Sequence, residues 1–226
     1  MLQTLWSVKG GSGVTVVAAA LGAAQADRAG RAVIVDLCGD QPAALGLAEP
    51  PGPGVTEWLA SPDGGARSLA RLSVPVDEHL AVLPRGEVHE WPRERVEELI
   101  AALADLPCPV VVDAGVWHEA PGPAGHLHAA LRGASRSLLV TRACYLSLRR
   151  AISFDVPVDG VVLVREVGRA LDRGDLEAAL GLPVVATVDW DPAVARAVDG
   201  GLLGRRVPRR LTRPLRGLLV PEVVAA

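Results

Sequence analysis

The stretch that most constrains the fold is residues 6–17, an apolar run that breaks into a glycine-rich turn and resumes as an alanine-rich segment. Strand, glycine loop and helix, in that order, build a phosphate site from backbone amides at a helix N-terminus. Gly10, Gly11 and Gly13 let the main chain curl so that successive N–H groups point inward, and Thr15 places a hydroxyl where a magnesium ion on the phosphates would sit. The sequence therefore predicts a loop shaped for an anion.

One position of this loop departs from the standard pattern. Standard phosphate loops place Lys and then Ser or Thr after the last glycine, but residue 14 is Val, which cannot donate to a phosphate. Lys9, at the front of the loop, is the only lysine among the 23 basic residues. Because an ammonium is a compact and flexible point charge, its position beside the turn favours a role at the phosphate. The alternative is a solvated lysine with no such role.

The segment Lys9 to Thr15 resembles the deviant Walker A motif, K-G-G-x-G-K-[ST], of the ParA/MinD family of P-loop ATPases. The resemblance implies ATP and Mg²⁺ as ligands. It also implies a catalytic role for Lys9, which matches the family's signature lysine, and a dimer with a second copy or with an active relative, because that lysine reaches across an ATP-bound dimer. The family's phosphate-loop lysine falls on Val14 and is missing. The nucleotide-binding stretch implied is Lys9, Gly10, Gly11, Ser12, Gly13, Val14, Thr15 and Val16.

Length and composition limit the class of protein. With 226 residues, half of them hydrophobic, the chain can bury one sizeable core, and we expect a single domain over residues 1–226. The net charge of −3 creates no whole-protein field that favours nucleic acid. The three cysteines form no C-x-x-C pair, which argues against a disulfide framework. No charged region precedes the first apolar stretch and no apolar run reaches ~20 residues, so we expect a cytoplasmic protein.

Short apolar runs alternate with helix-period segments along the chain. This pattern predicts an α/β fold of three layers, a mostly parallel sheet flanked by helices. Strands are expected at residues 2–8, 31–37, 80–83, 109–113, 137–141, 160–164 and 184–188. Helices are expected at residues 14–28, 93–105, 146–152, 171–180 and 193–198. Residues 50–54 and 121–123, which are rich in Pro and Gly, are expected to form turns.

Two aspartates end predicted strands. Ligands of open α/β sheets lie beyond the carboxyl ends of the strands, where Asp36 and Asp113 are expected. Together with Thr15 they form a candidate magnesium site, with the ion held directly or through water. The alternative for either residue is a turn former or a helix cap.

The family resemblance extends to these strands and covers about residues 2–216. Residues 33–40 are similar to the family's second-strand motif, in which a second Asp orients the attacking water, but that position is Cys38. Asp40 lies two residues further on, about 6 to 7 Å along an extended chain and outside hydrogen-bond reach of the same water. Residues 110–115 are similar to the Walker B strand and retain Asp113. Residues 160–165 resemble the strand that precedes the adenine-contacting segment, which implies nucleotide binding by Arg165.

The two missing groups bear on activity. Phosphoryl transfer depends on charge neutralisation and positioning, so their loss predicts weak or static nucleotide binding with little or no hydrolysis. The resemblance implies a spatial organiser or adaptor for a protein cargo, in chromosome or plasmid partitioning or in positioning a division site or surface machine. Two alternatives stay open. One is an active ATPase in which Lys9 compensates for Val14, and the other is a nucleotide-free scaffold of a pilus-assembly or division complex.

A basic segment lies near the end of the chain, at residues 204–220. Nonspecific DNA or an anionic membrane is a candidate partner for it, which would place the protein at the nucleoid or the membrane periphery. Pro208 and Pro214 interrupt a long helix there, and the alternative is a last helix packed on the sheet with its arginines solvated. The arginines are Arg205, Arg206, Arg209, Arg210, Arg213 and Arg216.

Two aromatic positions carry alternatives as well. Trp117, which His118 and Glu119 follow, marks a partner surface if it is exposed, and otherwise packs locally. Asp189-Trp190-Asp191 is expected to be a strand end and a helix cap, with adenine contact as the alternative.

Overall fold

A central sheet organises the protein, and the structure, a computed structural model, describes residues 1–62, 65–117, 122–154, 158–205 and 207–220. The strand order within the described residues is β3-β4-β2-β5-β1-β6-β7-β8. Neighbouring strands run parallel, except for the short antiparallel pair of β3 and β4. The strands are β1 (Leu2–Ser7), β2 (Ala32–Asp36), β3 (Val74–Pro75), β4 (Leu80–Leu83), β5 (Val110–Val116), β6 (Arg136–Arg142), β7 (Gly160–Arg165) and β8 (Val184–Asp189).

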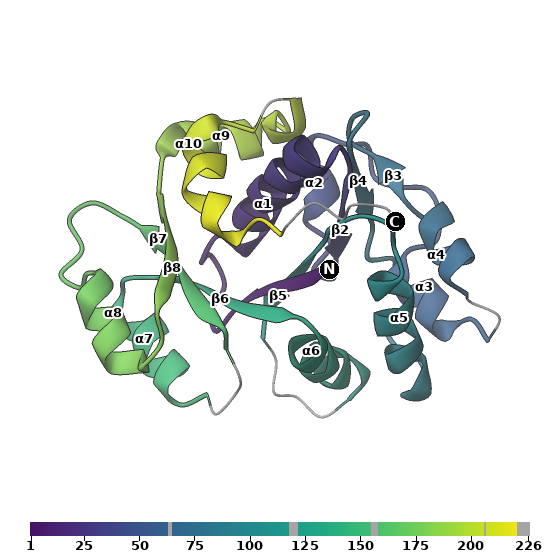
Figure 1. The fold of residues 1–226 in the computed structure, drawn as a ribbon, viewed down its shortest axis with the longest axis horizontal. Coiled ribbons are helices and arrows are strands. Elements are labelled where there is room, and N and C mark those ends of the chain that lie inside the picture. Colours follow the sequence, from purple (N-terminus) through teal and green to yellow (C-terminus); the bar gives the residue numbers. More distant parts are fainter. Residues whose placement is uncertain (63–64, 118–121, 155–157, 206, 221–226) are drawn as a thin grey trace.

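Helices cover both faces of the sheet (Figure 1). On one face lie α1 (Val14–Ala29), α2 (Gln41–Leu45), α9 (Pro192–Asp199), α10 (Arg209–Thr212) and the 3₁₀ turns η1 (Leu203–Arg205) and η2 (Arg213–Leu218). On the other lie α3 (Val55–Ala60), α4 (Ala66–Arg71), α5 (Glu94–Ala104), α6 (Pro123–Ala134), α7 (Tyr145–Ile152) and α8 (Arg173–Leu180).

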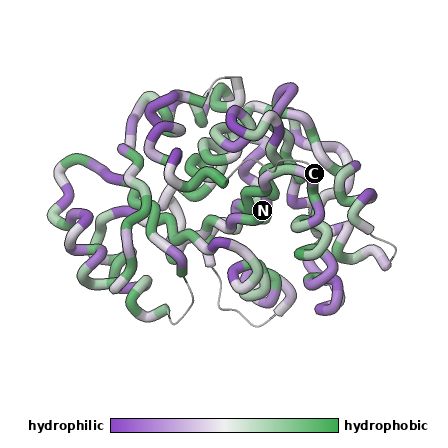
Figure 2. The backbone as a smooth tube through the Cα atoms, in the orientation of Figure 1, coloured by the Kyte–Doolittle hydropathy of each residue, from purple (hydrophilic) through white to green (hydrophobic). Residues whose placement is uncertain are grey.

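Two apolar cores follow from this arrangement, one on each face. Successive side chains of a strand point to opposite faces, and in β2 Val33 and Val35 join the core under α5 while Ile34 joins the core under α1. Strands that are buried on both faces are apolar throughout, which Figure 2 shows as hydrophobic colour along the central strands and α1. Polar functional side chains are therefore expected at the carboxyl ends of the strands, outside both apolar cores.

The predicted fold class is confirmed. All seven expected strands are present, and the ends differ by up to three residues, at β5, which continues to Val116. The five expected helices are present as well. The helix α6, with 12 residues, was not predicted. Short elements were missed as well, since β3, α2, α3, α4 and α10 have between two and six residues and show no full period. The prediction of a turn at residues 121–123 was wrong for Pro123, which opens α6 because proline suits the first turn of a helix.

The described part of the C-terminal segment packs against the sheet. Leu211, Leu215 and Leu218 are buried in the core that α1 covers. The Gln3 amide donates to the Leu218 carbonyl at 2.9 Å, and Gln25 donates to Gln3 at the same distance. The apolar side chains of this segment are therefore committed to the protein interior.

The arginines of the segment point outward instead. Arg209, Arg210, Arg213 and Arg216 are exposed, and Arg210 pairs with Asp191 at 2.7 Å. Arg206 and the side chain of Arg205 lie outside the described residues. The sequence left two interpretations of this segment, a surface for DNA or membrane and a last helix packed on the sheet. The buried leucines agree with the second, and the arginines are exposed to solvent. Within the described residues, we find no helix of the length and apolar character that spanning a membrane requires.

Candidate functional site

The glycine loop connects β1 to the N-terminus of α1. Gly11 and Gly13 have φ of 73° and 94°, which side chains rarely adopt, so glycine is required at both. Ser12 Oγ donates to the Lys9 carbonyl at 2.7 Å, and Lys9 Nζ donates to the Gly10 carbonyl at 3.2 Å. No side chain caps α1, and its first turn contains no acidic residue. The first N–H groups of a 16-residue helix are thus available to an anion.

A cavity of about 270 Å³ lies against this loop. Loop residues 10–16 line it together with Cys38, Asp40 and Gly115, so the structure brings the predicted anion loop and the ends of β2 and β5 to one place. The Val14 side chain is buried in the α1 core, with 6% of its surface exposed. Position 14 therefore offers an anion its backbone and no side-chain donor.

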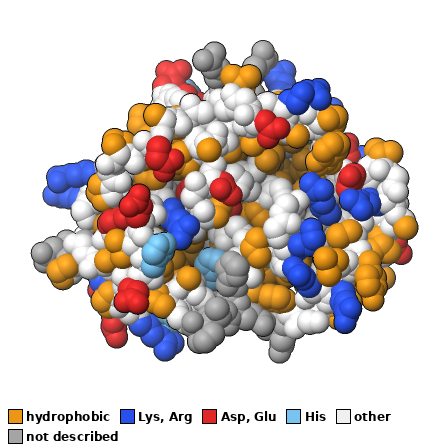
Figure 3. Space-filling model, turned by 180° about the vertical axis from the view of Figure 1, so that it is seen from behind, with side chains coloured by type: hydrophobic (Ala, Val, Ile, Leu, Met, Phe, Trp, Pro, Cys, Tyr) orange, Lys and Arg blue, Asp and Glu red, His pale blue; other side chains and the backbone are white. Residues whose placement is uncertain are grey.

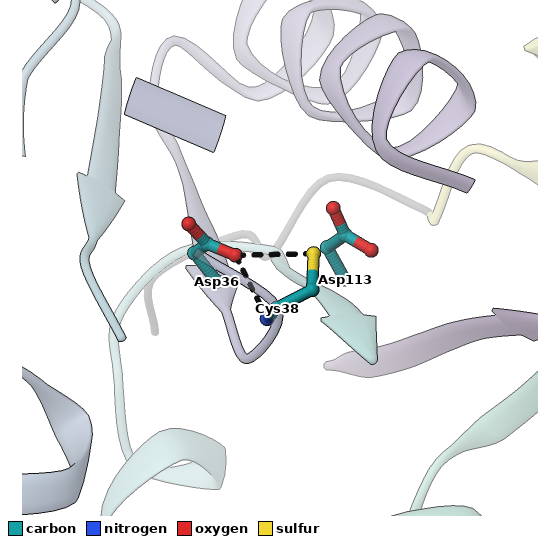
Figure 4. Close-up of side chains that lie close together, drawn as sticks. All are labelled: Asp36, Cys38 and Asp113. Carbon is teal, nitrogen blue, oxygen red and sulfur yellow. Dashed lines mark hydrogen bonds between the residues drawn. The ribbon is translucent and has the colours of Figure 1, made fainter. Parts of the chain in front are cut away.

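Asp36, at the end of β2, and Asp113, in the middle of β5, are neighbours in the sheet and fully buried. The strand that Asp113 was expected to end continues for three more residues. Figure 4 shows the two side chains with Cys38 close to both. Asp36 Oδ1 accepts from the amides of Cys38 at 3.0 Å and Gly39 at 2.8 Å, and Oδ2 accepts from the Gln41 amide at 3.1 Å. Three backbone donors thus engage this carboxylate, so Asp36 orders the turn that follows β2 as well as contributing charge.

Asp113 is engaged mostly by side chains, whereas Asp36 is engaged mostly by backbone amides. Its Oδ1 accepts from the Gly115 amide at 3.1 Å and its Oδ2 from Gln41 Nε2 at 2.9 Å, and it also contacts Thr15 and Cys38. Burial, and then the neighbouring charge of Asp36, raise the pKa of Asp113 to about 6. Burial also raises the pKa of Asp36. Two adjacent buried carboxylates with shifted pKa values are the electrostatic signature of a cation site.

Cys38 occupies the position at which the ParA/MinD motif has an Asp that orients the attacking water. Its Sγ lies 3.4 Å from Asp36 Oδ1 and 3.8 Å from Thr15 Oγ1. Burial and the two carboxylates raise the pKa of the Cys38 thiol, which keeps it neutral. A neutral thiol is a weak hydrogen-bond partner and cannot serve as a base for water.

The donor set fits magnesium in part. One ligand atom each from Asp36, Cys38 and Asp113 lies within 4.8 Å of the others. Magnesium prefers oxygen, which Thr15, Asp36 and Asp113 supply, whereas sulfur suits softer metals. These three residues would hold Mg²⁺ on a bound phosphate directly or through water, and Asp36, whose oxygens accept from three backbone amides, would act through water.

A second cavity of about 420 Å³ adjoins the first, and the two share Gly11, Gly13 and Val16 in their linings. Its other walls are mostly apolar and include Trp190, which is 42% exposed. Asp189 ends β8, and Asp191 caps α9 by accepting from the Ala193 amide at 2.7 Å, as expected. The surface that Trp190 adds is suited to an aromatic ring.

The structure does not bring Arg165 to either cavity. Its guanidinium is exposed and pairs with Asp189 at 2.6 Å, and it lines a separate hollow with Arg169 and Asp172. Two residues that sequence reasoning missed lie at the site instead. Gln41 ties Asp113 to the Thr15 carbonyl, and Arg142 lines the apolar cavity. Arg142 ends an apolar strand, which was a usable signal, whereas nothing local distinguishes Gln41.

Trp117 is buried and packs locally. It contacts Trp6, with ring centroids 5.8 Å apart, and the Arg132 guanidinium lies 3.8 Å from its ring centroid. The interpretation as an exposed partner surface was therefore wrong at Trp117, because α6 covers the ring. His118 and Glu119 lie outside the described residues.

Comparisons with known proteins agree with this geometry. A family model described as cellulose biosynthesis protein BcsQ matches residues 1–110. A ParA family ATPase from Chlorobium tepidum superposes with a TM-score of 0.76 at 20% identity, covering 97% of this chain and 99% of the other. The chain has the fold of ParA/MinD ATPases, and its first 110 residues match the BcsQ family model. No significant match is found among the sequences of curated proteins.

Two further ParA/MinD structures show the same fold. MinD from Pyrococcus horikoshii, in complex with Mg-ADP, has a TM-score of 0.70 at 17% identity, covering 96% of this chain and 93% of that one. The MinC:MinD complex of Aquifex aeolicus has a TM-score of 0.72 at 18% identity, covering 97% of each chain. At these identities the likeness concerns the fold, and the ligands and partners are those of the other proteins.

Proposed function

We propose that this ParA/MinD-like protein binds ATP with Mg²⁺, hydrolyses it slowly or not at all, and uses the bound nucleotide to switch between partners as a spatial organiser or adaptor. One observation carries the proposal. The glycine loop and Thr15 line the phosphate cavity and Asp113 contacts Thr15 beneath it, while position 14 is a buried valine and position 38 a neutral thiol.

The binding half of the proposal is supported by the two adjoining cavities. The loop amides and the N-terminus of α1 suit the phosphates, and the apolar cavity beside Trp190 suits the base. Burial and the charge of Asp36 raise the pKa of Asp113, and a bound cation would stabilise the ionised carboxylate. Removing one charged hydrogen bond of about 1.5 to 3 kcal/mol, as the missing lysine does, weakens binding by about ten- to a hundredfold and does not abolish it.

The slow-hydrolysis half is supported by what faces the end of the phosphate cavity. Catalysis of phosphoryl transfer needs a positioned water and neutralised charge. The Cys38 thiol contacts Asp36 and Thr15. Position 38 therefore offers no carboxylate that could orient the attacking water or accept its proton. Asp40 lines the cavity but is exposed, and no partner holds its carboxylate among the described contacts.

The organiser role is supported by the partners that ParA/MinD structures show. Lys9 lies half-buried on the loop, and the one hydrogen bond of its ammonium among the described residues is to the neighbouring Gly10 carbonyl, which leaves the ammonium two donors for a second chain. Figure 3 shows basic side chains gathered on the half of the molecule that carries α7 and α8. Arg149 and Arg150 of α7 and the exposed tail arginines make nonspecific DNA or an anionic membrane candidate surfaces.

Calorimetric titration of ATP with Mg²⁺, together with a phosphate-release assay, tests the proposal. We expect measurable binding, no release above background, and loss of the Mg²⁺-dependent part of the affinity in Asp113→Ala. Restoring the missing groups in the double variant Val14→Lys/Cys38→Asp is expected to produce phosphate release. Ordinary turnover by the wild type that Asp113→Ala abolishes would contradict the proposal in favour of an active ATPase. Absence of binding at millimolar ATP would favour a nucleotide-free scaffold.

A further inference from the structure

Arg142 stands at the carboxyl end of β6, on the face of the sheet where α1 begins. Val140, two residues earlier in the strand, points into the α1 core, so Arg142 points to the same face. Its register partner in β7 is Val164. A Cβ at Gly13 would lie 3.5 Å from Val164 Cγ2, so the loop passes directly over this part of the sheet. Arg142, Gly11 and Gly13 line the same cavity.

The guanidinium of Arg142 is only partly satisfied. Its Nε is buried and has no hydrogen-bond partner among the described residues. Its ion pair with Glu166 has a distance of 3.7 Å, too long for a hydrogen bond, and Glu166 is held at 2.5 Å by Arg169. With 28% of its side chain exposed, Arg142 is a largely buried cation that lacks strong partners.

Two of the three acidic residues that line the same cavity are paired with other arginines, and the third, Asp199, is exposed. Arg165 pairs with Asp189 at 2.6 Å, and Arg210 pairs with Asp191 at 2.7 Å. Neither carboxylate is therefore paired with Arg142. A buried guanidinium with an open donor beside an anion loop is a site for an anionic oxygen, which accepts from its planar fork of N–H groups.

We infer that Arg142 binds the polyphosphate of the nucleotide and supplies the positive charge that position 14 lacks. This inference rests on the proposed nucleotide binding. The glycine loop then provides backbone donors, Thr15 and Asp113 serve the metal side, and Arg142 approaches from the neighbouring strand. A cation placed on β6 replaces one placed on the loop, which explains how the site keeps affinity for phosphate although Val14 belongs to the core.

Equilibrium titrations of ATP and of adenosine, with Mg²⁺ present, separate this role from a structural one. The variants are Arg142→Met, Arg142→Lys and, as a matched control, Arg136→Met at the opposite end of the same strand. We expect Arg142→Met to weaken ATP binding by about ten- to a hundredfold and to change adenosine binding less than about twofold. Arg142→Lys should retain part of the ATP affinity, and Arg136→Met should match the wild type.

Each other outcome is decisive. Unchanged ATP affinity in Arg142→Met, or equal weakening of ATP and adenosine, would overturn the role of Arg142 and leave the proposed function standing. A wild type that binds neither ligand would overturn the proposed function, and the inference with it. Thermal melts of each variant, compared with the wild type, show whether a loss of binding reflects a loss of fold.

Discussion

At the scale of single residues, two substitutions relative to the family motif change what the site can do. Val14 turns a position for a donor into part of the core, and Cys38 puts a neutral thiol where a carboxylate would orient water. Asp113 keeps its place with both oxygens hydrogen-bonded and its pKa raised to about 6. At the residue scale, the proposed function therefore assigns binding to the groups that the site keeps and the loss of catalysis to the two that it lacks.

The first prediction concerns the pH dependence of stability. Because the pKa of Asp113 rises from 3.8 to about 6 on folding, the folded protein binds the extra proton between these values. Stability from this group is present at low pH and falls as pH rises from about 4 to about 6, by up to about 3 kcal/mol. Asp113→Asn removes this dependence, so the variant should gain stability relative to the wild type across that window. Urea unfolding at several pH values, with metal chelated, measures it.

The control for this prediction is Asp27→Asn, which changes an exposed carboxyl of α1. Its unfolding free energy at each pH gives the effect of removing one carboxyl charge at the surface. Parallel pH profiles for Asp113→Asn and the wild type would show that Asp113 does not titrate in this range.

At the scale of elements, close backbone approaches position the loops around the site. Gly46 ends α2 with φ of 74°, and a Cβ there would collide with the carbonyl of Gly201, just beyond α9. This contact joins the two segments that flank the N-terminus of α1. The C-terminal turn η2 packs against α1 and β8, with its leucines buried and its arginines exposed.

A second prediction follows from the approach of these two segments. Gly46→Ala should lower the free energy of unfolding by about 2 to 5 kcal/mol, because a left-handed alanine is strained and the neighbouring backbone must shift. Gly52→Ala is the matched control, since nothing lies within 4 Å of its Cβ position. Equal stability of the two variants in urea unfolding would mean that α2 and the turn after α9 do not pack in solution.

A third prediction concerns the C-terminal turn. Leu215 is fully buried, and Leu215→Ala should cost about 2 to 5 kcal/mol. Arg216→Ala removes an exposed neighbour and should stay within about 0.5 kcal/mol of the wild type. Chemical denaturation compares them. If Leu215→Ala proved as mild as Arg216→Ala, the turn would be detached from the core, and its leucines would be available to a membrane.

At the scale of the whole molecule, the parallel sheet collects its chemistry at one edge. The glycine loop, Asp36, Asp113 and Arg142 come from four different strands and meet at the carboxyl ends. Lys9 lies at the same edge on the loop and is half-buried. In the proposed function, this edge is both the ligand site and the surface that contacts a second copy.

The fourth prediction tests this double use of the edge. Addition of ATP with Mg²⁺ should double the mass measured by light scattering in the wild type, and Lys9→Ala should remain monomeric although it binds nucleotide. Arg31→Ala, which removes an exposed cation at the opposite end of the sheet, should behave as the wild type. A dimer that forms without nucleotide, or in Lys9→Ala, would argue against the signature role of Lys9.

The sequence by itself determined the fold class, seven of the strands, five of the helices, and the positions of the glycine loop and the two aspartates. These depend on local periodicity and on residues a few positions apart, which a chain displays before it folds. Short elements such as α2 and α4 lack a full period and were missed for that reason.

Only the tertiary structure decided in which direction several side chains of the site point. Val14 faces the core, Gln41 reaches across to Asp113, Trp117 lies under α6, and Arg142 opens into the cavity beside Gly13. Each outcome depends on segments far apart in the chain meeting in space. Their contacts are set by packing between strands and helices, and no pattern within a single stretch of sequence records them.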